Sequence, residues 1–415
     1  MTNDHLSDKV ADGLLYIIAF SIPWAKAALP LLFMLWGGAL LWRYAGQRRI
    51  YRPACATPIW ASVITYLILL AYAMFGFANE RASEILEIKL SYIAVPIMAF
   101  LIKPITTIQL ERVYKWFVLG CFVFDVIAIT HASILFNSTG DPANLYYQGL
   151  SWYIHPSYQG LYHCFAIYLL ARSVFSTPMF AGSHVISFLL IIIYSMMLAA
   201  LASKAGIICL GALGLGFMWY SVVKKRAMKF IMPLTLAVVM AIFLINTILA
   251  GVASRMTEAS KDVGAWVNSG SEEVMQTTAY SSVTLRLVAW TSAFQVLLSN
   301  PFGVGTGRAS NFLDDYYISH QQPYAASHHL NAHQQFLQHG LDLGWMGILL
   351  LIITFLSLAR HLLRVGNYAG LVFCFLCAVN FMLESMLETQ AGIIFFFFWL
   401  MIYCKEQHEV KVLQQ

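Results

Sequence analysis

Long apolar runs separated by short polar segments are the main pattern of this chain. A run of roughly 20 apolar residues has the length that a helix needs to cross the hydrocarbon core of a bilayer. The pattern predicts twelve such spans, of which the first two are separated by a segment that Pro23 and Pro30 bound. The fourth span carries Glu84, Glu87 and Lys89 near its start. The expected spans are 13–26, 28–45, 58–77, 85–102, 110–136, 157–175, 184–202, 205–223, 230–251, 336–359, 368–386 and 390–404.

The segment 252–332 is the longest stretch between two expected spans. Within it, apolar residues recur at helical spacing over 282–298, which predicts an amphipathic helix lying at the membrane surface. The glycine-rich sequence 300–307 follows, and we expect a tight turn there rather than a nucleotide-binding loop, because no strand precedes it. The pattern therefore predicts one integral membrane domain, 1–415, with a long, partly helical loop between the ninth and tenth spans.

Composition supports an all-α polytopic membrane protein. The 415 residues are 60% hydrophobic and 11% charged, with a mean hydropathy of +0.69. A soluble domain carries roughly 25% charged residues, so lipid must be the solvent for much of this surface. The net charge of +5 is small and dispersed, which argues against a nucleic-acid partner. The polar first residues show no small-residue cleavage site, so no cleavable signal peptide is expected.

Lysine and arginine residues gather at alternate ends of the expected spans. Because basic loops stay on the cytoplasmic side of a membrane, this alternation predicts that both termini are cytoplasmic. The 137–156 and 252–332 loops then lie on the opposite, periplasmic or exterior, face. The basic residues on the expected cytoplasmic face are Arg43, Arg48, Arg49, Arg52, Lys103, Arg112, Lys115, Arg172, Lys224, Lys225, Arg226, Lys229, Arg360, Arg364 and Lys405.

Histidines gather where the long loop meets the tenth span, in the sequence 328–347. On a helix, His333 would share a face with Gly340 and Gly344, whose spacing lets helices approach closely in lipid. Histidine titrates near neutral pH and suits a general base acting on a hydroxyl group. We therefore predict His333 as the catalytic residue; the alternative is an interfacial histidine that only caps the helix or hydrogen-bonds there.

A metal site is not expected from these residues. His329 and His333 are four residues apart, a spacing that can hold a metal ion on a helix. No acidic or cysteine ligand stands at a suitable spacing beside them. The seven cysteines lie mostly inside apolar runs, and none lies in the 252–332 loop, so neither a disulfide framework nor a cysteine-based zinc site is expected. No cofactor is predicted.

Four cations on the expected outer face could bind an anion: Lys204, Arg255, Arg286 and Arg308. Charges near a low-dielectric boundary are costly unless they are paired or used. Arginine offers a planar fork for phosphate oxygens and lysine a point charge, so a lipid pyrophosphate would suit them. Anchoring to lipid headgroups is the alternative for each.

Aromatic residues are frequent in the 137–158 loop. Trp152, His155 and Tyr158 are candidates for contacts with a glycan, because aromatic faces with polar tips suit sugar stacking. The alternative is an interfacial aromatic belt. Two carboxylates on the same face, Glu384 and Glu388, are expected to pair with basic residues for structural reasons.

These motifs resemble the O-antigen ligase and O-antigen polymerase superfamily. In that superfamily a polytopic chain has a long periplasmic loop near its end, which closes on a histidine motif. Here the motif comprises His333, Gln334, then nine residues, then Gly344 and Gly347.

Two further segments are similar to elements of the same superfamily. Arg286, Trp290 and the sequence 300–305 resemble its R-x3-W…P-x-G-x-G segment. The sequence 203–206 resembles its S-R-x-G element, with Lys204 in place of arginine. That replacement keeps the charge and loses the bidentate fork.

The resemblance implies a glycosyltransferase of the C type in the bacterial inner membrane, with its active site facing the periplasm. The donor would be O-antigen linked to undecaprenyl pyrophosphate, and a ligase would transfer it to a sugar hydroxyl of lipid A-core. Pyrophosphate is a good leaving group, so fixed cations can replace a metal and one base suffices. A direct displacement would invert the anomeric centre. Gln334 and His329 are further candidates for contacts with the glycan or acceptor.

Three alternatives remain open from the sequence. The polymerase that extends the lipid-linked glycan, and a protein O-oligosaccharyltransferase, belong to the same superfamily. A transporter or flippase of lipid-linked glycan belongs to another class, and it should show polar groups deep in its spans and inverted repeats. Most spans here are apolar, and polar residues gather on one face, which favours chemistry at the membrane surface.

Overall fold

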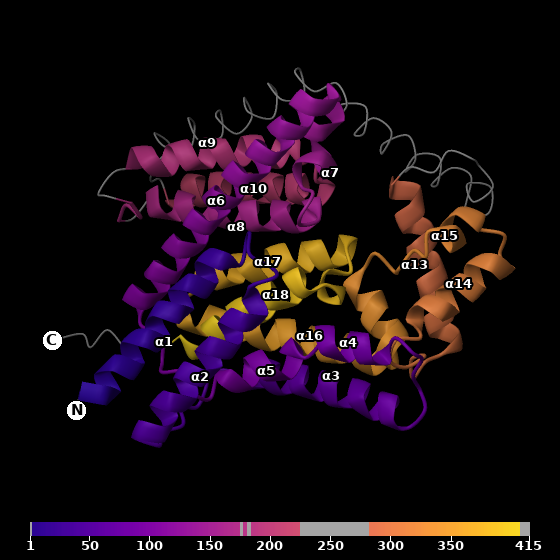
Figure 1. Ribbon diagram of the computed structural model, residues 1–415, viewed down its shortest axis with the longest axis horizontal. Coiled ribbons are helices and arrows are strands. Elements are labelled where there is room, and N and C mark those ends of the chain that lie inside the picture. Colours follow the sequence, from indigo (N-terminus) through magenta and orange to yellow (C-terminus); the bar gives the residue numbers. More distant parts are fainter. Residues whose placement is uncertain (1, 175–176, 181–183, 225–281, 407–415) are drawn as a thin grey trace.

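The computed structural model describes residues 2–174, 177–180, 184–224 and 282–406 (Figure 1). Across these ranges the chain is helical and contains no strand, as the fold prediction required. The ninth expected span, 230–251, lies outside the described residues, as do Arg255 and the first part of the long loop, up to residue 281.

Most of the expected spans that lie within the described residues overlap a single helix. Three of them, α3, α6 and α16, are long and apolar enough to cross a membrane, which supports a membrane protein. The total of twelve spans stays a prediction. The helices that match single expected spans are α1 (Thr2–Ser21), α2 (Leu29–Gln47), α3 (Thr57–Met74), α6 (Thr107–Thr139), α8 (Pro156–Val174), α9 (His184–Ala200), α10 (Lys204–Lys224), α16 (Gln335–Val365), α17 (Tyr368–Leu383) and α18 (Gln390–Lys405).

The fourth expected span is not one helix. It is divided into α4 (Ala82–Ile88) and α5 (Ser91–Met98), each too short to cross a bilayer. The division falls at Lys89, whose side chain is 1% exposed and forms ion pairs inside the protein. A buried charge with fixed partners holds the chain at this point, so the apolar composition of 85–102 does not produce a continuous span.

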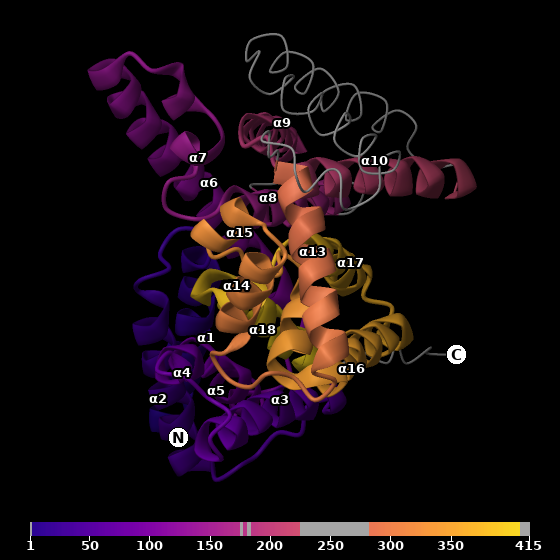
Figure 2. The same ribbon diagram turned by 90° about the vertical axis from the view of Figure 1, so that its right-hand side faces the viewer.

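Helix α18 lies at the centre of the helical stack, between helices on several sides (Figures 1 and 2). Every residue from Ala391 to Lys405 is buried, and a helix that is apolar all round must be covered by protein or lipid. The outer helices instead expose large apolar side chains, such as Leu31, Met34 and Leu35 of α2. These outward-facing side chains fit contact with lipid tails.

The helices have two chemically different ends. At one end lie α13 (Ser282–Ser299), α14 (Ala309–Ser319) and α15 (Pro323–Ser327), which face the viewer in Figure 2. The predicted helix over 282–298 is thus confirmed as α13. At the other end, backbone hydrogen bonds from Ala54 to Cys404 and from Ile105 to Lys405, 2.8 and 2.9 Å long, tie three basic loops together. Three of the basic segments expected on one face therefore share one end of the stack.

Helix α16 is broken at Gly344, which has φ 67° and ψ −160°. The turn 300–307 packs its backbone against this break, with hydrogen bonds from Val304 to the Leu341 carbonyl (2.7 Å) and from Trp345 to the Pro301 carbonyl (3.1 Å). A Cβ at Gly344 would overlap the Pro301 carbonyl oxygen. The expectation of a continuous helix face through Gly340 and Gly344 is therefore wrong. Gly344 permits close contact with a loop, and its backbone conformation is one that glycine alone adopts readily.

Replacing Gly344 with Ala is expected to destabilise the protein by about 3 kcal/mol or more, because the added methyl group meets backbone and the φ angle is strained. The melting temperature of the purified protein in detergent measures this loss. Gly211→Ala is the matched control, since nothing lies within 4 Å of a Cβ there and the helical glycine costs up to about 1 kcal/mol relative to alanine. Equal melting temperatures for the two variants would contradict the docking of 300–307 on α16.

Candidate functional site

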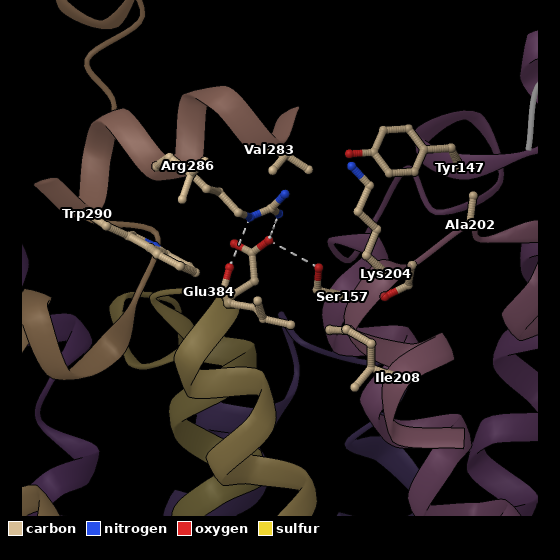
Figure 3. Close-up of a pocket in the computed structure, with 13 residues that line it drawn as sticks. Tyr147, Ser157, Ala202, Lys204, Ile208, Val283, Arg286, Trp290 and Glu384 are labelled. Atoms are coloured by element: carbon tan, nitrogen blue, oxygen red, sulfur yellow. Dashed lines mark hydrogen bonds and ion pairs between the residues drawn. The ribbon is translucent and has the colours of Figure 1, made fainter. Parts of the chain in front are cut away.

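A cavity of about 310 Å³ opens between α13, the start of α10 and the turn that follows α17 (Figure 3). This volume falls at the lower end of the range of small-molecule sites. Its walls are mostly apolar and its polar groups come from five separate segments. The lining residues are Tyr147, Ser157, Ala202, Ser203, Lys204, Ala205, Ile208, Val283, Arg286, Leu287, Trp290, Leu383 and Glu384.

Glu384, which ends α17, binds three partners at once. Its Oε1 accepts hydrogen bonds from Arg286 Nη2 and from Ser157 Oγ, the latter 3.2 Å away. Its Oε2 lies 3.4 Å from His333 Nδ1. Arg286 also donates from Nε to the Leu383 carbonyl at 3.1 Å. The expected pairing of Glu384 with a basic residue is confirmed, and that residue is one of the predicted anion-binding cations.

The surroundings of Glu384 keep it ionised. Burial by itself favours the protonated carboxyl, but the hydrogen bond from His333 and the positive charge of Arg286 outweigh it and lower the pKa of Glu384 to about 2. Near neutral pH the cavity therefore holds a fixed negative charge. That charge orients both the guanidinium group and the imidazole ring.

His333 lies in the loop before α16 and not on the helix, which begins two residues later at Gln335. Its φ is 43°, a left-handed conformation that non-glycine residues seldom adopt. The backbone N–H of His333 donates to Asn331 Oδ1 at 2.9 Å, and the His333 carbonyl accepts from Trp290 Nε1 at 3.1 Å. The prediction that His333 stands on the helix face is therefore wrong. The loop and α13 hold it, with its side chain 29% exposed.

Strained backbone gathers at this site. Besides His333, the cavity residues Tyr147 and Ala202 have φ of 52° and 46°. Left-handed conformations of such residues cost roughly 1–2 kcal/mol each and persist where the surrounding structure holds them. Two of them in the cavity wall and a third at His333, which contacts Glu384, point to a site whose geometry matters more than its local stability.

The structure brings together two of the four predicted anion-binding cations. Arg286 and Lys204 line the cavity from α13 and α10, and their side chains extend into it in Figure 3. Arg308 does not line it; its guanidinium lies over the Phe312 ring, 5.2 Å from the centroid. Arg255 lies outside the described residues. The guanidinium and ammonium groups both face the cavity, and such groups suit an anionic ligand.

The residues predicted to contact a glycan divide into two groups. His155 Nδ1 accepts from the Ser157 N–H at 3.3 Å, and burial lowers the pKa of His155 beside the cavity. The buried Tyr158 ring lies 5.7 Å from the His155 ring. Trp152 instead stacks on His131 at 4.3 Å and does not line the cavity.

The two remaining glycan candidates have structural partners. Gln334 caps α16, accepting from the Leu337 N–H at 2.5 Å. The exposed His329 lies 2.7 Å from Asp314 Oδ2. Since His329 and His333 face different carboxylates, the two histidines are not arranged as a metal-binding pair. In the described ranges, no group of three or more histidine, cysteine or acidic residues is placed to hold a metal ion.

Sequence reasoning missed Ser157 and assigned Glu384 only a structural role. Ser157 carries no local signal, because a serine at the start of a span is common. Glu384 does carry one, since a carboxylate at the end of an apolar segment needs a partner. Lys89 carries the same kind of signal, because it is a charged residue within an apolar segment. It pairs with Asp342 at 2.7 Å and with Glu388 at 3.0 Å, so the expected pairing of Glu388 with a basic residue is confirmed.

Replacing Glu384 with Gln is expected to lower the melting temperature at neutral pH and to matter less in acid. Its pKa is lowered from 4.5 to about 2, so the ionised form stabilises the fold fully above pH 4.5 and loses this effect as the pH falls toward 2. A shift of this size corresponds to about 3 kcal/mol at most. The melting temperatures of wild type and Glu384→Gln should therefore converge as the pH is lowered from neutral to about 3. A gap that stays constant would contradict the assignment. Glu84→Gln, which removes an exposed surface partner of Arg81, is the control for loss of a carboxylate.

Comparison with protein families finds a match over part of the chain. Residues 188–352 match the family model described as O-antigen ligase, a segment that includes Lys204, Arg286 and His333. The match confirms the resemblance and supports a member of the O-antigen ligase superfamily, whose members are glycosyltransferase-like enzymes of O-antigen processing. Glu384 and Lys89 lie outside the matched segment. No curated protein matches the chain.

Proposed function

We propose that this member of the O-antigen ligase superfamily is the ligase itself. It transfers O-antigen from undecaprenyl pyrophosphate to a sugar hydroxyl of lipid A-core. The observation that carries the proposal is the cavity that Arg286, Lys204 and Glu384 line; His333 does not line it but contacts the Glu384 carboxylate. This combination supplies an anion site for the leaving group and a base for the acceptor.

The donor pyrophosphate binds at the two cations. A guanidinium group has five N–H donors in a fixed fork, so Arg286 can hold Glu384 and face a phosphate oxygen at once. Lys204 adds a second positive charge from the opposite wall. The apolar side chains of Val283, Leu287 and Ile208 provide a surface for the first isoprene units. The cations stabilise the charge that develops on the departing pyrophosphate.

His333 acts as the general base. As the acceptor hydroxyl attacks the anomeric carbon, its proton passes to His333 and a new C–O bond forms. The bond between the anomeric carbon and the pyrophosphate oxygen breaks, and its electron pair leaves with the pyrophosphate. Glu384, 3.4 Å from Nδ1, orients the ring and stabilises the imidazolium that results. One displacement of this kind inverts the anomeric configuration.

We place the reaction at the periplasmic face of the bacterial inner membrane. The cavity is lined by α13, which lies with α14 and α15 at one end of the helices, and three basic loops lie at the other. If the basic end is cytoplasmic, as is usual for such loops, both termini are cytoplasmic and the cavity opens to the periplasm. A lipid-linked donor that is exposed in the outer leaflet then reaches it directly.

The polymerase is the alternative that shares this chemistry. Its acceptor is another lipid-linked glycan, while the pyrophosphate site and the base would be the same. A transporter site is expected near the middle of the spans, whereas His333 and Glu384 lie at the ends of α16 and α17, which favours an enzyme.

His333→Ala should fold normally and lose glycan transfer by at least about 100-fold, the lower range for removal of a general base. Transfer of O-antigen to lipid A-core by the purified variant measures this. His328→Ala is the matched control, because this exposed histidine stacks on Tyr324 at 4.0 Å away from the cavity. Near-normal transfer by the His333 variant would remove it as the base.

Arg286→Ala should reduce kcat/KM for the donor at least about tenfold, since hydrogen bonds to charged groups contribute about 1.5–3 kcal/mol. Arg286→Lys keeps the charge and should recover only part of the loss, because the bidentate fork is gone. Arg81→Ala, which removes an exposed arginine paired with Glu84, is the control. Unchanged donor kinetics in Arg286→Ala would exclude a pyrophosphate role.

A further inference from the structure

A buried lysine joins the two segments that carry the candidate base and its carboxylate partner. Lys89 lies between α4 and α5 and is 1% exposed. Its Nζ lies 2.7 Å from Asp342 Oδ2 on α16 and 3.0 Å from Glu388 Oε1 on the 3₁₀ helix η2 (Met386–Glu388). One cation thus binds both segments, although neither carboxylate belongs to the cavity.

Gln335 extends this cluster toward the site. Its Oε1 accepts from the Leu387 N–H, and its Nε2 donates to Glu388 Oε1 at 3.2 Å. The same Nε2 lies 2.9 Å from His339 Nδ1, which therefore accepts. His339 then carries its proton on Nε2 and donates it to the Tyr92 hydroxyl at 3.0 Å. Each hydrogen bond in this chain orients the side chain that makes the next one.

The cluster joins the same two segments as the contact between His333 and Glu384. His333 stands two residues before Gln335, and Glu384 stands four residues before Glu388. A further hydrogen bond, from the Gln334 N–H to Ser385 Oγ at 3.1 Å, joins the same two segments. The separation of His333 Nδ1 from Glu384 Oε2 is therefore set by how the two segments are held together.

We propose that Lys89 is a positioning residue for glycan transfer, which acts by holding the His333 loop and the Glu384 turn in register. The proposal rests on the function proposed above, because it assigns Lys89 no chemistry of its own. Replacing a buried ion pair by apolar residues is often neutral for stability, whereas such pairs can fix a unique geometry. The ionic cluster at Lys89 then serves the geometry of the site more than the stability of the fold.

The charge balance of the cluster fits this role. Burial raises the pKa of Glu388, and the neighbouring Lys89 charge opposes this shift. Once the charges of Lys89 and Asp342 are both removed, burial favours the neutral, protonated form of Glu388, so the double variant should fold.

The test compares Lys89→Met, Lys89→Met/Asp342→Asn and Lys89→Arg with wild type as purified full-length proteins. The double variant should fold with a normal melting temperature, bind undecaprenyl-pyrophosphate-linked glycan with unchanged affinity and lose kcat about tenfold or more, because small displacements of a base are costly. Lys89→Arg, which keeps the charge, should recover part of kcat. Lys103→Met, which breaks the 2.6 Å ion pair with Asp8 away from the cavity, is the control and should keep wild-type kinetics.

A wild-type kcat in the folded double variant would overturn the proposal. So would donor affinity that falls in parallel with kcat, since that pattern marks general damage rather than loss of positioning. The His333→Ala variant in the same assay separates the two proposals. If it transfers glycan normally, the proposed function fails; if it is inactive while the double variant is fully active, only the role of Lys89 fails.

Discussion

The buried carboxylate of Glu384 is the interaction on which the candidate site depends. It gathers Ser157, Arg286 and His333 from three segments that are far apart in the chain. A buried charge without partners would be protonated, so the carboxylate stays ionised only while these partners surround it. The same requirement that keeps Glu384 charged therefore brings the proposed base and one of the proposed phosphate-binding cations to one place.

Close backbone contact supplies the second constraint. The turn 300–307 packs on the break at Gly344, and α13, which carries Arg286, leads directly into that turn. Gly303 and Gly344, which belong to the motifs that resemble the superfamily, thus have a structural role: they allow the backbone contact that joins α13 to α16. His333 and Arg286 both contact the Glu384 carboxylate. The contact between the 300–307 turn and α16 holds α13, and the Lys89 cluster holds the His333 loop and the Glu384 turn.

Local pattern predicted most of the helices and part of the site. Apolar runs located α16 to α18, and cations on the expected outer face included Arg286 and Lys204, which the cavity unites. The predicted position of His333 on the helix face was wrong. Hydrophobic periodicity indicates which side chains are buried, but it does not indicate a left-handed φ in the loop before the helix. The partners of Arg286 and Lys89 lie 98 and 253 residues further along the chain, a separation that no local pattern can bridge.

The most direct test of the central claim is transfer by the purified protein from undecaprenyl-pyrophosphate-linked glycan, with lipid A-core and a second lipid-linked glycan offered together as acceptors. A ligase with the site described above forms glycan-bearing lipid A-core of inverted anomeric configuration, and this product disappears with His333→Ala. Elongated lipid-linked glycan without modified lipid A-core would contradict the ligase assignment, and full transfer by His333→Ala would contradict the site.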